Sequence, residues 1–312
     1  MMRLLTALSA VAFVAGGWPA RVQNHNPTFR GGVRTVAVYA TVQERGGRLV
    51  PDLTREDFEI LDNGRPVQLT VFSNEPLPIT VALMLDMSNS MVDEFTQVRE
   101  AARHFVDLLG PADRARIGSF GDELALSPHL TGDKRLLVRV LEEELWPGGG
   151  TPLWSALYAA MGSLASEPGR RVVLTLTDGD DACFLRIRPR PKVISDRPIE
   201  LRPGYVNYCS TFERVRARAV RQEFMLYAIG MPDLSDDMQV LSVNTGGGFF
   251  TLGRHANLRE SFARVVEELR HQYGLGFSPP VLDGATHTLE VRVRRPGLTA
   301  RARKSYIASE ER

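Results

Sequence analysis

The sequence predicts an α/β protein whose doubly wound, mostly parallel sheet is flanked by a small β domain built from both ends of the chain. From residue 79 onward, short apolar runs alternate with amphipathic segments, which is typical of parallel strands joined by helices. The run that begins at Ile79 is apolar at consecutive positions, as expected for a strand covered on both faces. Near both ends of the chain, apolar and polar residues instead alternate, which is typical of half-buried strands.

Apolar runs and helical periodicity give the expected order of elements in the α/β region. Strands are expected at 79–85, 115–121, 171–177, 224–230 and 248–252, with a short edge strand near 123–127. Helices are expected at roughly 92–109, 133–145, 152–166, 211–222, 234–243 and 256–272. In the first of these helices, the apolar face recurs at helical spacing from Phe95 to Leu109.

The segment before the α/β region contains the turns of a small β unit. Val33–Val42 alternates as a half-buried strand, and Thr54 followed by Asp57 predicts a single helical turn. Asp62-Asn63-Gly64 is a strong hairpin signal, and its return strand is expected at Val67–Phe72.

The segment after the α/β region also alternates, with strands expected at Leu289–Arg294 and Thr299–Ile307. Neither terminal segment is long enough to bury a core alone. We therefore expect residues 33–75 and 274–312 to pair into one small β domain, with the α/β domain, residues 76–273, inserted between them.

Composition and charge exclude several classes of protein. The chain has 312 residues, of which 43% are hydrophobic and 24% charged, so extensive disorder and a fibrous fold are excluded. The net charge of +1 gives no overall field that would attract nucleic acid or a membrane surface. Arginines near the C-terminus are expected to form the polar face of alternating strands rather than an anion site: Arg292, Arg294, Arg295, Arg301 and Arg303.

The first residues have the form of a secretory signal. Met1-Met2-Arg3 is a short basic start, Leu4–Gly17 is apolar, and the segment ends with the turn-forming Pro19 and the small Ala20. We expect a signal peptide at 1–20, a flexible lead-in at 21–32, and a periplasmic, cell-envelope or extracellular protein. An uncleaved N-terminal anchor is the alternative. No other stretch of the sequence could cross a bilayer.

The chain has two cysteines, Cys183 and Cys209. Export would place them in an oxidising compartment, where we expect a disulfide; two free, partly buried thiols are the alternative. No third cysteine or suitably spaced histidine supports zinc. The long basic segment 182–210 would lie beside the site described next, either as a loop that selects the ligand or as a covering ornament.

Three polar loops are expected at the carboxyl-end edge of the sheet. They are Asp86-Met-Ser88-Asn-Ser90, Gly148-Gly-Gly-Thr151-Pro152, and Asp178-Gly179. Each loop alone could be an ordinary helix cap or turn. The neighbouring Asp180 and Asp181 are expected to be solvated turn acids, with a second ion site as the alternative. Ligands of parallel sheets bind outside the carboxyl ends of the strands, and oxygen ligands suit Mg²⁺. Together the loops therefore predict a cation site at one edge of the sheet.

An Asp-x-Ser-x-Ser loop, a threonine after a glycine-rich turn and an aspartate at a later strand end together resemble the von Willebrand factor A domain. The resemblance covers about residues 79–272 and implies that family's Rossmann-like fold. It also implies a metal-ion-dependent adhesion site whose ligands here would be Asp86, Ser88, Ser90, Thr151 and Asp178. The flanks, including Phe29-Arg-Gly-Gly-Val and Tyr273-Gly-Leu-Gly-Phe-Ser, are similar to an exported bacterial subgroup first noted in acidobacteria.

The resemblance implies a binding protein rather than an enzyme. A cation, Mg²⁺ with Mn²⁺ or Ca²⁺ as alternatives, would coordinate an Asp or Glu carboxylate of a protein ligand. The sequence lacks the Gly-x-Ser-x-Gly elbow of serine hydrolases and the Gly-x-x-x-x-Gly-Lys loop of nucleotide-binding proteins. We therefore expect a metal-dependent adhesion or protein-binding module. The alternative is a structural or assembly module of the cell envelope in which the metal only stabilises the fold.

Overall fold

The computed structural model describes residues 35–145, 147–179, 181–183, 209–230, 236–251 and 257–309. The expected signal peptide and lead-in lie outside these residues, as does most of the segment between the two cysteines. None of the described helices has both the length and the apolar character needed to cross a membrane.

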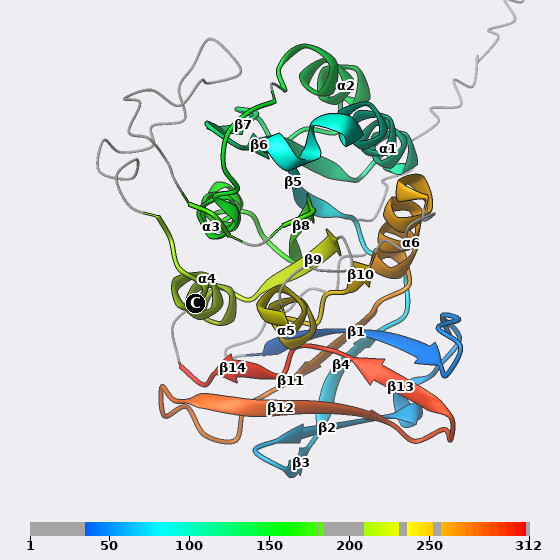
Figure 1. Cartoon of the computed structure of the whole chain (residues 1–312). Helices are drawn as coiled ribbons and strands as arrows, with labels where there is room; N and C mark the ends of the chain where they lie inside the picture. Colours follow the sequence, from blue (N-terminus) through cyan, green and yellow to red (C-terminus); the bar gives the residue numbers. More distant parts are fainter. Residues whose placement is uncertain are drawn as a thin grey trace, which may run out of the picture.

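A six-stranded sheet forms the centre of the α/β region, in the order β10-β9-β8-β5-β6-β7 (Figure 1). Its strands are β5 Thr80–Asp86, β6 Arg114–Phe120, β7 Leu124–Leu126, β8 Arg171–Thr177, β9 Phe224–Gly230 and β10 Phe249–Thr251. Neighbouring strands run parallel, except that β7 is antiparallel to β6. Because β5 lies inside the sheet and later strands extend it on both sides, the predicted doubly wound, mostly parallel sheet is confirmed.

Helices cover both faces of this sheet (Figure 1). On one face lie α1 Phe95–Leu108, α2 Lys134–Glu143 and α6 Leu258–Arg270; on the other lie α3 Leu153–Ser163, α4 Phe212–Arg221 and α5 Asp236–Asn244. Alternate residues of β5 enter different cores, so Leu83 packs with the first group and Met84 with the second. Every residue of β5 is consequently buried, which explains its unbroken apolar run.

Local capping explains where several helices begin. Asp133, Thr211 and Asn257 each accept hydrogen bonds from backbone N–H groups in the first turn of α2, α4 and α6. The first helix differs from the expectation, because a 3-10 helix, η2 Asn89–Glu94, precedes α1. This tighter turn connects the Asp86 loop directly to α1.

Strands from both ends of the chain form two four-stranded antiparallel sheets below the α/β region in Figure 1. Their orders are β13-β1-β11-β4 and β14-β12-β2-β3. The strands are β1 Val36–Glu44, β2 Phe58–Asp62, β3 Arg65–Val67, β4 Leu69–Ser73, β11 Tyr273–Phe277, β12 Thr286–Val293, β13 Leu298–Arg301 and β14 Ser305–Ile307. The two sheets share one apolar core, which includes Val38, Ile60, Leu275 and Tyr306, and so form a sandwich. The single helical turn expected near Thr54 is η1, Arg55–Asp57.

Two segments expected as single strands are each divided between the two sheets. In place of a return strand at 67–72, β3 pairs with β2, and β4 pairs with β11. In place of a last strand at 299–307, β13 pairs with β1, and β14 pairs with β12. Alternation of apolar and polar residues is the same in either sheet, so it does not reveal a strand that changes sheets.

The side chain of Arg170 lies where the chain crosses between the sandwich and the α/β region. It is buried and donates hydrogen bonds to the carbonyl groups of Leu77 and Pro78, just before β5. It also donates to the carbonyl of Leu269 and, at 2.6 Å, to the side-chain oxygen of Gln272, just before β11. Burial lowers the pKa of this guanidinium. One buried side chain therefore ties together both crossings of the chain.

Glu268 forms a second buried link across the same junction. Its carboxylate accepts hydrogen bonds from Gln43 of β1 at 2.9 Å and from the hydroxyl of Tyr227 of β9 at 3.2 Å. It also forms an ion pair with Arg301 of β13. Burial raises the pKa of the Tyr227 phenol, with a further contribution from the charge of Glu268. The sandwich and the α/β region thus share a polar network rather than a purely apolar contact.

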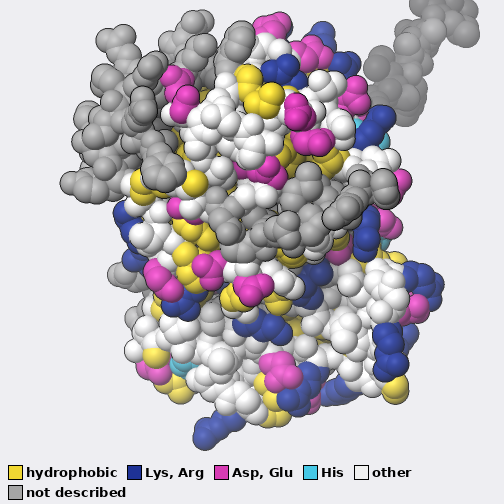
Figure 2. Space-filling model, viewed as in Figure 1, with side chains coloured by type: hydrophobic (Ala, Val, Ile, Leu, Met, Phe, Trp, Pro, Cys, Tyr) yellow, Lys and Arg dark blue, Asp and Glu magenta, His cyan; other side chains and the backbone are white. Residues whose placement is uncertain are grey.

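The arginines near the C-terminus therefore differ in role. Three lie on the surface of the sandwich in ion pairs, namely Arg292 with Glu290, Arg294 with Glu59, and Arg295 with Asp57. Arg301 and Arg303 do not belong to an exposed polar face, because they pair with Glu268 and Glu223 at the junction. On the molecular face shown in Figure 2, acidic and basic side chains are interspersed.

Candidate metal-binding site

Asp86 is the last residue of β5 and lies at the carboxyl-end edge of the central sheet. It is fully buried. Its Oδ1 accepts a hydrogen bond from the backbone N–H of Ser88 at 2.9 Å, and its Oδ2 accepts one from the hydroxyl of Thr177, the last residue of β8. Because β5 and β8 are parallel neighbours, Asp86 lies beside the loop that begins with Asp178.

Hydroxyl groups connect the two loops. The Oγ atoms of Ser88 and Ser90 lie 3.1 Å apart, and the Ser90 hydroxyl donates to Oδ1 of Asp178 at 3.0 Å. Ser88 is only 2% exposed, whereas Ser90 is exposed and Asp178 is half-buried. The structure therefore brings Asp86, Ser88, Ser90 and Asp178 together in one hydrogen-bonded chain that runs from the buried end of β5 to the surface.

This chain of groups carries two carboxyl groups, those of Asp86 and Asp178. No lysine, arginine or histidine in the described part of the protein forms an ion pair with Asp86 or Asp178. Burial raises the pKa of the Asp86 carboxyl, hydrogen bonds from Ser88 and Thr177 oppose that shift, and the charge of Asp178 adds to it. A cation at this point would favour the ionised form of both carboxyl groups.

The glycine-rich loop packs closely against the loop after β5. The N–H of Asn89 donates to the carbonyl of Gly149 at 3.1 Å, and the N–H of Gly149 donates to Oδ1 of Asn89 at 3.2 Å. Gly149 has a φ of +88°, and a Cβ there would lie 2.1 Å from Oδ1 of Asp122 and 2.4 Å from its backbone nitrogen. Glycine at this position therefore permits both the backbone conformation and the close approach.

Thr151 reaches the same edge of the sheet through its backbone. Its N–H donates to the carbonyl of Ala182 at 3.2 Å, and the N–H of Ala182 donates to the carbonyl of Thr151 at 2.8 Å. None of the hydrogen bonds among the described residues joins the Thr151 hydroxyl to the other four candidate side chains. This pair of backbone bonds, which we call the Thr151–Ala182 bridge, ties Thr151 to the segment that follows Asp178.

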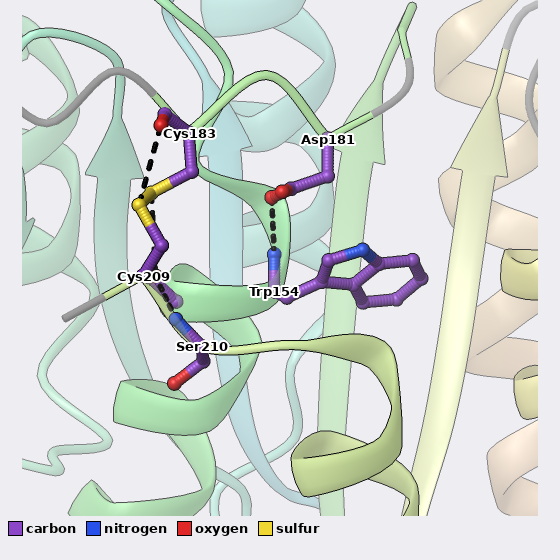
Figure 3. Close-up of a disulfide and its surroundings, with 6 residues drawn as sticks. Trp154, Asp181, Cys183, Cys209 and Ser210 are labelled. Carbon is purple, nitrogen blue, oxygen red and sulfur yellow. Dashed lines mark hydrogen bonds between the residues drawn. A yellow bond between two sulfur atoms is a disulfide. The ribbon is translucent and has the colours of Figure 1, made fainter.

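A disulfide follows this bridge in the chain, and Figure 3 shows it. It joins Cys183, which follows the bridge directly, to Cys209, and their Cα atoms lie 6.0 Å apart. The next residue, Ser210, donates its backbone N–H to Oγ of Ser155 in α3 at 2.9 Å. The disulfide therefore holds the segments before and after residues 184–208 close to the beginning of α3.

Asp181 has a structural role that the sequence did not indicate. Its Oδ1 accepts a hydrogen bond from the backbone N–H of Trp154 at 3.0 Å, so it caps the first turn of α3 (Figure 3). Burial raises the pKa of this carboxyl, and hydrogen bonds from the N–H groups of Trp154 and Leu153 oppose the shift. The interpretation as a solvated turn acid is therefore wrong for Asp181, while Asp180 lies outside the described residues. The sequence offered one signal for this role. Pro152 stands at the N-cap position of α3 and has no side chain that can accept a hydrogen bond, so the acceptor had to come from elsewhere.

The candidate ligands fit a hard divalent cation. They supply two carboxylates and three hydroxyl groups, and Mg²⁺ is usually bound by one or two carboxylates and keeps several waters. Among the described residues no three His, Cys, Asp or Glu side chains gather in a way that could hold a metal. A cation at this edge would therefore depend on hydroxyl oxygens as well as on Asp86 and Asp178.

Comparison with protein families matches residues 81–180 to the von Willebrand factor type A domain. This segment is a von Willebrand factor type A domain. The matched residues include all five candidate ligands at the carboxyl-end edge of the sheet. A comparison with curated proteins gives no match.

Solved structures with a similar arrangement include other von Willebrand factor type A proteins. One from Catenulispora acidiphila is 13% identical, with a TM-score of 0.48, and the match covers 92% of this chain and 77% of that one. The domain of the type V pili tip protein Mfa5 from Porphyromonas gingivalis is 14% identical, with a TM-score of 0.46, and the match covers 62% of this chain and 95% of that one.

Proposed function

We propose that the von Willebrand factor type A domain of this chain binds a divalent cation and, through it, a protein ligand. Asp86, Ser88, Ser90, Thr151 and Asp178 would hold the cation, with Mg²⁺ as the first choice and Mn²⁺ or Ca²⁺ as alternatives. The proposal is supported by the hydrogen-bonded chain from Asp86 to Asp178, whose carboxylates have no basic partner among the described residues.

The positions of these residues suggest what each contributes to binding of the cation and the ligand. When bound, the cation would supply a positive charge that attracts an Asp or Glu carboxylate of the ligand. Asp86 lies at the buried end and would offset part of the cation's charge from inside the protein. Ser90 and Asp178 lie nearer to solvent, on the side from which a ligand can approach. Such a module binds and does not catalyse a reaction.

We also propose that the protein acts outside the cytoplasm. The signal-like first residues support this, and so does the Cys183–Cys209 disulfide, because disulfides persist mainly in oxidising compartments. In that setting the ligand would be a component of the cell envelope or the extracellular space.

Calorimetric titration of the full chain with Mg²⁺ tests the cation site. Asp86→Asn keeps the size and an acceptor oxygen of the side chain but removes its charge, and we expect Mg²⁺ to bind it at least about 100-fold more weakly. Asp93→Asn is the matched control, because Asp93 is an exposed acid in η2, a few residues after Ser90. Equal Mg²⁺ affinity in the wild type and Asp86→Asn would contradict the proposal.

Capture of proteins from a cell-envelope extract tests the second half of the proposal. The immobilised wild-type chain should retain a ligand in Mg²⁺ and release it in EDTA, and Asp86→Asn should retain none. If Mg²⁺ binds with normal affinity but capture is the same in Mg²⁺ and in EDTA, the cation has only a stabilising role. The alternative of a structural module would then replace the binding module.

A further inference from the structure

Three links join the segment after Asp178 to the segment that carries Thr151. The first is the Thr151–Ala182 bridge, with backbone hydrogen bonds of 3.2 and 2.8 Å. The second is the hydrogen bond from the N–H of Trp154 to Asp181. The third is the Cys183–Cys209 disulfide, whose far side is fixed to α3 through Ser210 (Figure 3). We call residues 181–183 with Cys209 the clamp.

We propose that the clamp positions Thr151 and Asp178 for the cation, and that the oxidation state of its disulfide sets the affinity of the site. The inference rests on the proposed cation site and adds to it. Neither Asp181 nor the two cysteines would touch the cation, so they are positioning residues.

The reason lies in how Thr151 is held. The side chains of Asp86, Ser88, Ser90 and Asp178 each take part in a hydrogen bond to another member of the site, whereas Thr151 is placed by its backbone. Its backbone partner, Ala182, stands between Asp181 and Cys183, the two residues that anchor this segment to α3. Loosening either anchor would let the bridge shift, and a ligand displaced by about 1 Å no longer meets the geometry that a small cation requires.

Cys209 is exposed, so a reductant in solution can approach the disulfide from its side. A dithiol reductant would transfer two electrons and two protons, so that the S–S bond breaks, Cys183 and Cys209 become thiols, and the reductant becomes a disulfide. The segment after Asp178 would then be held to α3 by hydrogen bonds alone. Since the chain has only two cysteines, a reductant acts on this single bond.

Calorimetric titration of the full chain with Mg²⁺, before and after treatment with a dithiol, tests the role of the disulfide. Reduction should weaken Mg²⁺ binding by about 10-fold, and Cys183→Ser/Cys209→Ser should match the reduced protein with or without the dithiol. Circular dichroism of each sample checks that it remains folded. Equal affinity before and after reduction, with Asp86→Asn still unable to bind, would overturn the clamp but leave the cation site standing. Absence of Mg²⁺ binding in the oxidised wild type would overturn both.

A pair of substitutions tests Asp181 separately. Asp181→Asn retains an oxygen that can accept the N–H of Trp154 and should bind Mg²⁺ nearly as well as the wild type. Asp181→Ala lacks the acceptor and should bind about 10-fold more weakly. Equal Mg²⁺ affinity of the two variants would overturn the positioning role of Asp181, whatever their melting temperatures.

Discussion

Each edge of the central sheet contains a buried charged side chain, Arg170 at one edge and Asp86 at the other, but their surroundings differ. At the amino-end edge, Arg170 is enclosed and donates to oxygen atoms on both crossings between the sandwich and the α/β region. At the carboxyl-end edge, Asp86 is equally buried, but the chain of groups that starts from it opens to solvent at Ser90. Buried charge that is surrounded by partners holds a fold together, whereas buried charge that lacks a counter-charge favours a ligand that supplies one.

This comparison predicts that substitutions at the amino-end edge change stability and that those at the carboxyl-end edge change cation binding. Arg170→Leu should have the largest effect. It leaves several buried acceptors without a donor, so we expect the free energy of unfolding to fall by about 3–5 kcal/mol. Urea denaturation measures this, with the exposed Arg135→Leu as a control expected to change stability by less than about 0.5 kcal/mol. A loss below about 1 kcal/mol for Arg170→Leu would show that the junction is not a stabilising centre.

Addition of Mg²⁺ should have the next largest effect on stability, and this effect should depend on the carboxyl-end edge. At a free Mg²⁺ concentration 100 times the dissociation constant, a ligand that binds only the folded state adds about 2.7 kcal/mol of stability. We expect that gain in the wild type and none in Asp86→Asn. In EDTA, Asp86→Asn should be at least as stable as the wild type at pH 7, because burial disfavours the charged carboxylate. An Asp86→Asn protein that is much less stable in EDTA would show that Asp86 serves the fold.

Two glycines, one at each edge, give a matched test of close packing. Gly149 and Gly169 both have positive φ values, +88° and +76°, but a Cβ would collide with Asp122 at Gly149 and meets no atom within 4 Å at Gly169. Alanine should cost about 1 kcal/mol at Gly169, from the backbone alone, and about 2–3 kcal/mol at Gly149. Denaturation in urea compares the variants, and Mg²⁺ affinity should fall only for Gly149→Ala. Equal losses of stability would indicate that Asp122 moves aside freely.

The smallest expected effect concerns pH and lies in the sandwich. His287 is buried, with Nδ1 2.8 Å from Asp62 and Nε2 3.2 Å from Asp283. Burial opposes the charged imidazole, but the hydrogen bonds that it donates to Asp62 and Asp283 outweigh this effect and raise the pKa of His287. A raised folded-state pKa means that this stabilisation is complete below about pH 6.5, the ordinary value for histidine, and is lost as the pH rises through the folded-state pKa.

We therefore expect the free energy of unfolding to decline by on the order of 1 kcal/mol as the pH rises above 6.5. His287→Gln should remove this decline, and the exposed His129→Gln should keep it. Urea denaturation at several pH values provides the measurement. A decline that persists in His287→Gln would assign it to another group.

The α/β part of the fold could be predicted because its sequence pattern is local. The apolar run of β5 and the helical periodicity of α1 each report burial within a few residues of themselves. The sandwich was harder, since β3 pairs with its sequence neighbour β2, whereas β4, which follows directly, pairs with the distant β11. No local pattern marks that choice.

The candidate site, too, could be predicted only in part from the sequence. Asp86, Ser88, Ser90 and Asp178 could be grouped in advance, because parallel strands end at one edge of a sheet. Asp181 was missed since its partner, Trp154, is 27 residues away in sequence. Arg170 was missed for a related reason: an arginine before a strand gives no sign that it will be buried among carbonyl groups from two other segments.

The pairing of β4 with β11 has a consequence for the modular use of this chain. Ser73, the last residue of β4, lies directly opposite Gly274, the second residue of β11. A polypeptide that joined these strands through a two-residue turn would form an ordinary hairpin in the same register. The α/β region therefore occupies the position of a single loop between β4 and β11 of the sandwich. A designer could replace it there with a short turn, or with another domain whose two ends lie side by side.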